Sequence, residues 1–270
     1  MKKFQTKSIF AIGMPGVGKT TYMASAYHAL CASPDFRASV SPDSNADYFY
    51  DVIDHLASGR FPPSTPGPGR GFFPFSVEVS PTDLSRGVPT KFSTFDFSGK
   101  DLVNVLDNFD LFLQRVLEPT KAKPSMWFTN LSDFIRKSDG ILFLAEPVDS
   151  KVKQIQLDEQ YTKLFRLVYA ILKGSRLSDG KPVRTPLALV LTKVDRDESG
   201  QLAADPAGHF KSAYPQTTRY VEDSFFSVKA FGCSSVGTAE ERGEGAVPAL
   251  PLKPVGVLDP LCWLLGYAFG

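Results

Sequence analysis

The residues best suited to chemistry lie near the N-terminus, in the run Gly13-Met-Pro-Gly-Val-Gly-Lys-Thr20. A glycine, four further residues and then Gly-Lys-Thr is the spacing of a phosphate-binding loop. Such a loop has few bulky side chains, so its backbone N–H groups can converge on a β-phosphate at the positive end of the following helix. The residues expected to bind the phosphates are Pro15, Gly16, Val17, Gly18, Lys19, Thr20 and Thr21.

Two residues of this run have separate expected roles. The Lys19 ammonium can reach the β- and γ-phosphates, and the Thr20 hydroxyl is placed to bind Mg²⁺. The alternative is an ordinary glycine-rich turn that caps a helix. An apolar run before the loop (residues 9–12) and a helical pattern after it (residues 20–32) supply the context that phosphate binding requires.

A second segment, Phe95-Asp96-Phe97-Ser98-Gly99, ends a predicted strand with the pattern D-x-x-G. The Asp96 carboxylate can hold Mg²⁺ through a water molecule. The Gly99 N–H can approach a γ-phosphate because no side chain obstructs it. The same pattern is common in ordinary turns, so it gains meaning only beside the first segment.

A third segment, Thr192-Lys-Val-Asp195, follows the apolar run at residues 187–191. The Asp195 carboxylate can accept hydrogen bonds from N1–H and the exocyclic N2 amine of guanine. Adenine presents neither donor there, so a carboxylate at this position discriminates between the two bases. The stem of Lys193 can lie over the base plane. The alternative is a turn at a strand end with solvated charges.

A fourth segment contains Ser227, Val228 and Lys229, which we place at the end of a strand predicted over residues 223–228. The backbone of a loop at this point could meet the guanine O6 atom.

In this order, the four segments resemble the Ras-like class of P-loop GTPases. Thr192 stands where that class usually has Asn, a variant also found among Rho-type members, and Val228 stands where it usually has Ala. The segments Gly59–Thr65 and Val257–Leu265 also resemble bacterial double-GTPase-type domains, which occur in multi-gene regulatory or conflict systems. The resemblance covers residues 8–20, 91–99, 140–146, 187–195 and 224–230, and a final helix.

The resemblance implies GTP or GDP as ligand, Mg²⁺ as cofactor and slow hydrolysis of GTP to GDP. It also implies a loop whose conformation a protein effector or activator senses. The switch residue expected between the first helix and the second strand is Thr65, with Ser64 as the alternative. Lys19, Thr65 and Gly99 are then the expected catalytic residues, and Thr20, Thr65 and Asp96 the expected metal ligands.

Lys100 departs from this class, which often has a water-orienting Gln directly after D-x-x-G. A lysine offers only donors and cannot accept a hydrogen bond from water as an amide oxygen can. We therefore expect slow hydrolysis, or a water-positioning group from elsewhere, for which Arg60 and Arg70 are candidates. Two alternatives remain: a pseudo-GTPase that only binds nucleotide, and an ATP-using P-loop enzyme, which the Thr192–Asp195 segment disfavours.

The elements that must position these residues alternate between strand and helix patterns, which predicts an α/β fold with a mostly parallel, six-stranded sheet flanked by helices. We expect one domain over residues 1–270, with insertions at about 35–72, 101–138 and 231–255. The predicted strands cover residues 9–12, 73–79, 91–97, 140–145, 187–191 and 223–228, and the predicted helices cover residues 20–32, 101–117, 157–172 and a last one from 259.

Composition excludes several other classes of protein. The 30 Lys and Arg nearly balance the 29 Asp and Glu, which argues against general nucleic-acid binding. Three scattered cysteines are too few for a disulfide framework or a zinc cluster. The apolar run at residues 261–269 is far shorter than the roughly 20 residues that span a bilayer. We expect a cytoplasmic protein without a membrane span.

Overall fold

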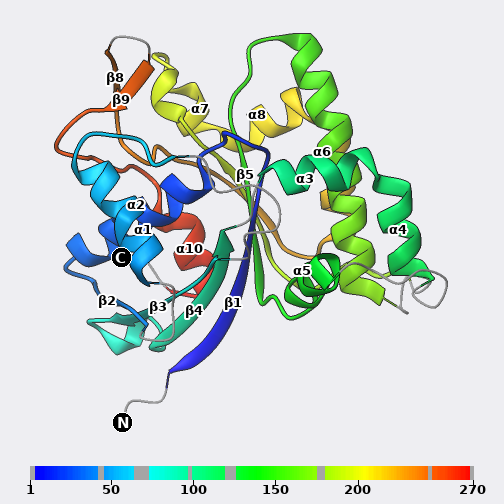
Figure 1. Ribbon diagram of the computed structural model, residues 1–270, viewed down its shortest axis with the longest axis horizontal. Coiled ribbons are helices and arrows are strands. Elements are labelled where there is room, and N and C mark those ends of the chain that lie inside the picture. The colour runs from blue at the N-terminus through cyan, green and yellow to red at the C-terminus, as the bar shows by residue number, and fades with distance from the viewer. Residues whose placement is uncertain are drawn as a thin grey trace.

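The computed structural model describes residues 4–41, 46–63, 73–96, 99–118, 126–174, 180–242 and 245–267. In this part of the chain, seven strands form one sheet in the order β2-β3-β4-β1-β5-β6-β7, and β8 and β9 form a separate hairpin (Figure 1). The strands are β1 (Gln5–Ile12), β2 (Phe36–Val40), β3 (Phe73–Pro81), β4 (Thr90–Asp96), β5 (Gly140–Ala145), β6 (Leu187–Leu191), β7 (Val228–Gly232), β8 (Ala239–Arg242) and β9 (Gly245–Pro248).

The predicted α/β fold with a mostly parallel sheet is confirmed. Neighbouring strands from β4 through β1, β5 and β6 to β7 are parallel. Only β3 is antiparallel to its neighbours, β2 and β4. The parallel strands therefore end at one common edge of the sheet, which we call the carboxyl edge. That residues 1–270 form one domain stays a prediction.

Helices cover both faces of the sheet (Figure 1). In β5, Ile141 and Phe143 point to one core and Leu142 and Leu144 to the other, so the whole strand is buried. This explains its uninterrupted apolar sequence. One face carries α1 (Lys19–Ala32), α2 (Ala46–Ala57) and α10 (Leu258–Leu265), and the other carries α3 (Gly99–Asp107), α4 (Phe109–Leu117), α5 (Met126–Arg136), α6 (Lys151–Lys173), α7 (Gln201–Ala204), α8 (Pro206–Ala213) and α9 (Pro215–Ser224).

The sheet has seven strands rather than the predicted six, because β2 lies in the stretch expected to be an insertion. Buried Phe36 begins β2, which pairs with β3 along its length. Helix α2 follows and buries Phe49, Val52 and Leu56, spaced three and four residues apart along one side of the helix. The proline- and glycine-rich run at residues 59–71 obscured both elements in the sequence.

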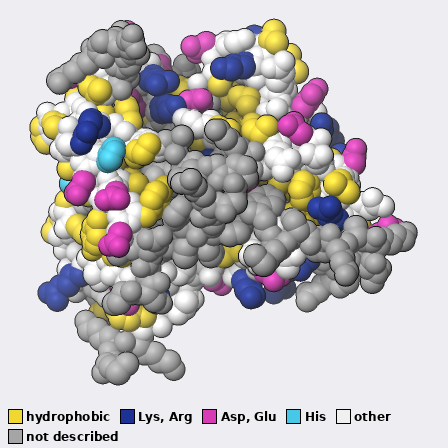
Figure 2. Space-filling model, in the orientation of Figure 1, with side chains coloured by type: hydrophobic (Ala, Val, Ile, Leu, Met, Phe, Trp, Pro, Cys, Tyr) yellow, Lys and Arg dark blue, Asp and Glu magenta, His cyan; other side chains and the backbone are white. Residues whose placement is uncertain are grey.

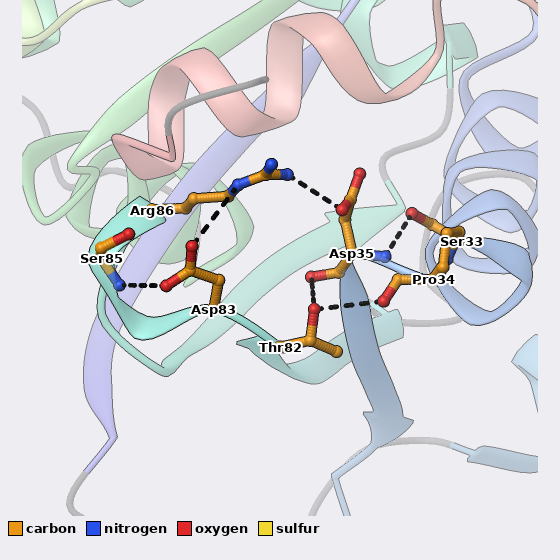
Figure 3. A network of polar contacts seen from close by, with 7 residues as sticks. All are labelled: Ser33, Pro34, Asp35, Thr82, Asp83, Ser85 and Arg86. Carbon is orange, nitrogen blue, oxygen red and sulfur yellow. Dashed lines mark hydrogen bonds and ion pairs between the residues drawn. The ribbon is translucent and has the colours of Figure 1, made fainter.

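A polar network fixes the start of β2 against the connection between β3 and β4 (Figure 3). The Arg86 guanidinium donates to the Asp35 carboxylate at 2.9 Å. The Thr82 hydroxyl lies 3.1 Å from the carbonyl oxygens of both Pro34 and Asp35. The network therefore joins the end of α1, through β2, to the rest of the sheet.

Two predicted boundaries are wrong for identifiable reasons. The helix predicted over residues 101–117 is divided at Asn108 into α3 and α4. The strand predicted over residues 223–228 begins only at Val228, because α9 continues through Ser224. Val221 and Phe225 are both buried, and they are four residues apart. The apolar residues there therefore follow the spacing of a helix rather than that of a strand.

The surface agrees with the balanced charge of the sequence. On the face shown in Figure 2, described side chains of both charge signs lie interspersed. Of the helices in the described residues, none combines the length and the apolar character that crossing a membrane needs.

The core of the sheet gives a first testable prediction. Phe143 is fully buried, with its ring centroid 4.8 Å from that of Tyr161 and 4.9 Å from that of Phe165. Phe143→Ala should lower the free energy of unfolding by about 3–5 kcal/mol, measured by denaturant titration. Phe226→Ala is the control, because Phe226 is 80% exposed, and it should change stability by less than about 0.5 kcal/mol. Equal losses would contradict this packing.

Candidate functional site

The predicted phosphate-binding loop joins β1 to α1 at the carboxyl edge. Gly16 and Gly18 have φ angles of 80° and 89°, in the left-handed region that favours glycine. Gly13 is required for a different reason: a Cβ atom there would lie 2.4 Å from the Leu144 carbonyl oxygen. The loop therefore begins in direct contact with β5. Within it, Pro15 is exposed and Val17 is buried.

The start of α1 has the properties of an anion site. Its N-cap residue, Gly18, has no side chain to satisfy the first backbone N–H groups, and no acidic residue stands in the first turn, which includes Thr20 and Thr21. The positive end of the helix dipole faces the loop. The Lys19 ammonium folds over that loop and donates to the carbonyl oxygens of Gly13 at 2.8 Å and Met14 at 3.1 Å. Backbone donors and a lysine thus converge at one place.

The second predicted segment reaches the same edge. Ser93 of β4 pairs with Ser8 of β1, and β4 continues for three more residues to Asp96 while β1 continues toward the loop. Gly99 begins α3. A threonine hydroxyl and a carboxylate are oxygen donors of the kind that Mg²⁺ prefers, so Thr20 and Asp96 fit a magnesium site by chemistry and by their backbone positions.

Several predicted residues lie outside this description. Thr65, Ser64 and Arg70 fall outside the described residues. Lys100 is the second residue of α3, but its side chain is outside the description. Arg60 is exposed after α2, and its Nε donates to the Ser58 hydroxyl at 3.2 Å. The switch residue and the source of a water-positioning group therefore stay predictions.

The third predicted segment is fastened to the phosphate-binding loop. The buried Thr192 hydroxyl lies 3.0 Å from the Val17 carbonyl oxygen and 3.1 Å from that of Ala145. Lys193, with φ of 57°, donates from Nζ to the Gly16 carbonyl oxygen at 2.8 Å and also forms an ion pair with Glu146. The structure thus brings together the two segments that the sequence linked to a nucleotide.

Asp195 stands next to this contact, in the short helix η3 (Val194–Arg196). Within the described residues, its carboxylate has no hydrogen-bond or ion-pair partner. It lies near Cys233, whose pKa is raised to about 12 by burial, with the Asp195 charge adding to the effect. Asp195 is therefore held close to the end of β7 with both oxygens available to a ligand.

The predicted position of Ser227, Val228 and Lys229 at the end of a strand is wrong. Val228 pairs with Leu187, the first residue of β6, and β7 runs parallel to β6. These three residues consequently lie at the start of β7, at the edge of the sheet opposite to Thr192. Parallel pairing, which a local pattern cannot specify, decides this placement.

The residues that the sequence analysis missed follow β7 on the carboxyl edge. Cys233 donates its N–H to the Leu191 carbonyl oxygen at 2.8 Å, and its carbonyl oxygen accepts from Val194 N–H at 3.3 Å. Ser234 then forms a two-bond bridge with Val255, and its hydroxyl accepts from the Gly237 N–H at 3.0 Å. The run Cys-Ser-Ser-Val-Gly after an apolar strand was the available signal. Glu146 was missed because a single carboxylate after a strand forms no motif.

Comparisons with known proteins found one matching family and several similar folds. A family model described as Double-GTPase 1 matches residues 10–247, which include all of the segments above. None of the curated proteins matches the chain. Similar solved structures include the Arl6 BBS3 small GTPase from Trypanosoma brucei with bound nucleotide analogue GppNp, at 14% identity and a TM-score of 0.44, covering 96% of this chain and 95% of that one. Another is the signal recognition particle receptor SRb-GTP/SRX complex from Chaetomium thermophilum, at 16% identity and a TM-score of 0.43, covering 90% and 95%.

The two glycine requirements of the loop can be separated by mutation. Gly13→Ala places a methyl group against the backbone of β5, and it should lower the free energy of unfolding by about 3 kcal/mol. Gly16→Ala meets no atom within 4 Å, so it should cost only the left-handed strain of about 1 kcal/mol. Denaturant titration of both variants measures the difference. The reverse order would show that contact with β5 does not govern the loop.

Proposed function

The chain belongs to the double-GTPase 1 family, and on that premise we propose that it binds GTP with Mg²⁺ and hydrolyses it slowly to GDP. The observation that carries the proposal is the attachment of the Thr192–Asp195 segment to the phosphate-binding loop through Thr192 and Lys193. This attachment would place a phosphate site and a base site one nucleotide apart at the same edge of the sheet.

In the proposed complex, the phosphates lie on the loop at the start of α1. Backbone N–H groups between Gly13 and Thr20 donate to the β-phosphate, and Lys19 extends toward the β- and γ-phosphates. The Thr20 hydroxyl and Asp96 would hold Mg²⁺, which supplies positive charge beside the β- and γ-phosphate oxygens. Thr65 is proposed as a further ligand, and the Gly99 N–H as a γ-phosphate donor.

The base lies between Lys193 and the loop after β7. Asp195 accepts from the guanine N1–H and N2 amine, and its lack of a described partner supports this role. Lys193 covers one face of the base. The backbone of residues 233–236, rather than residues 227–229, is proposed to meet guanine O6. Thr192 replaces the usual Asn while still bonding the Val17 carbonyl oxygen.

We further propose that hydrolysis changes the loops around Thr65 and Gly99 and that a protein partner senses this change. Lys100 in place of a glutamine favours slow turnover and keeps a binding-only pseudo-GTPase as the second candidate. Single-turnover hydrolysis of bound GTP, followed by phosphate release, separates the two. Measurable phosphate release above the rate of free GTP supports the enzyme, and none supports the second candidate.

The base assignment is tested by competition. GTP and GDP should displace a fluorescent guanine nucleotide in the presence of Mg²⁺, whereas ATP should not. Asp195→Asn replaces an acceptor by a donor that matches the xanthine C2 carbonyl, so it should weaken GTP by about 100-fold and strengthen XTP. Displacement by ATP, or an unchanged base preference in Asp195→Asn, would remove the argument for GTP.

The phosphate assignment is tested at Lys19. Lys19→Ala removes the ammonium that bonds the Gly13 and Met14 carbonyl oxygens of the loop, and it should weaken GTP and GDP by at least about 100-fold in the same titration. Lys211→Ala is the control, because Lys211 is exposed and pairs with Glu222 on the surface. Full affinity in Lys19→Ala would overturn the phosphate site.

A further inference from the structure

Glu146 lies in none of the four segments predicted to bind nucleotide, yet its carboxylate pairs with the Lys193 ammonium of the third segment. The two side chains are 29% and 28% exposed, respectively. We propose that Glu146 is a positioning residue that holds Lys193 across the phosphate-binding loop and thereby slows the release of guanine nucleotide. This inference rests on the proposed function and adds a residue that controls the lifetime of the complex.

Lys193 has a second hydrogen-bond partner besides Glu146. Its Nζ also donates to the Gly16 carbonyl oxygen at 2.8 Å. A lysine stem has four flexible carbons, so one bond to the carbonyl oxygen of an exposed loop residue restrains it weakly. The Glu146 carboxylate supplies a second, charged partner. With both partners in place, the stem is held where the base is proposed to lie before any nucleotide arrives.

Glu146 is itself held in place by a contact with a buried tyrosine. It follows directly after β5, and the Tyr214 hydroxyl donates to its carbonyl oxygen at 3.1 Å. Tyr214 is fully buried, with its ring 5.2 Å from that of Tyr161. Burial raises the pKa of Tyr214 to about 12, and the Glu146 charge adds to this effect. A chain of contacts therefore runs from the core through Glu146 and Lys193 to Gly16.

Asp195 carries the other carboxylate of the proposed base site. Asp195 is two residues from Lys193, but the two form no ion pair in the described part of the chain. Because Lys193 is paired with Glu146 instead, a guanine base need not displace the ammonium to reach Asp195. Glu146 therefore affects both proposed contacts with the base. It holds Lys193 in position, and it keeps the Lys193 ammonium from pairing with Asp195.

The test is the rate at which a fluorescent GDP is released into excess unlabelled GDP. Glu146→Gln keeps the size of the side chain and removes its charge, and it should speed release about three- to fivefold, as expected for a partly exposed ion pair. Glu222→Gln removes the surface pair with Lys211 and should leave the rate unchanged. In a Lys193→Met background, Glu146→Gln should add no further acceleration, because the residue acts through Lys193.

A second measurement separates positioning from a general loss of structure. Inorganic pyrophosphate should compete for the loop equally well in the wild type and in Glu146→Gln, since Lys193 does not face the phosphates in the proposed complex. Weaker pyrophosphate competition in Glu146→Gln would overturn the positioning role, as would an unchanged release rate or equal acceleration in the Lys193→Met background. A wild-type protein that fails to bind GDP would instead overturn the proposed function together with this inference.

Discussion

The buried hydroxyl group of Thr192 joins the loop after β1 to the ends of β5 and β6. Thr192 directly follows β6, and its side chain lies between the Val17 carbonyl oxygen of the loop after β1 and the Ala145 carbonyl oxygen that ends β5. Its backbone N–H also donates to Ala145, at 2.8 Å. Buried carbonyl groups at strand ends need partners, and here the loop ends satisfy one another. The relative position of the loop at residues 13–20 and the segment at residues 192–195 follows from this shared hydrogen bonding.

The local parts of the site could be predicted from the sequence because local rules determine them. Left-handed backbone at Gly16 and Gly18 requires glycine, and a buried strand such as residues 187–191 requires an apolar run. The placement of residues 227–229 could not be predicted in this way. It depends on the pairing of Val228 with Leu187, a contact between segments 41 residues apart that no short motif records.

Strand β2 and the β8–β9 hairpin also could not be predicted from local sequence patterns. Strand β2 has the alternation of a half-buried strand over only five residues, which is too short to stand out beside a long proline-rich run. The β8–β9 hairpin leaves the sheet after Ser234 and returns at Val255. Gly59, after α2, lies against Leu250 beyond the hairpin, where a Cβ atom would be 3.4 Å from the leucine side chain. Two segments distant in sequence therefore meet at this point.

Two carboxylates at the carboxyl edge, those of Glu146 and Asp195, differ in the partners that the fold gives them. Glu146 is tied to the core through Tyr214 and neutralised by Lys193, whereas Asp195 has no described partner. A lysine paired with Asp195 would have to be displaced by any ligand that donates to that carboxylate, at the cost of breaking a charged contact. Supplying Lys193 with a different acid avoids that competition.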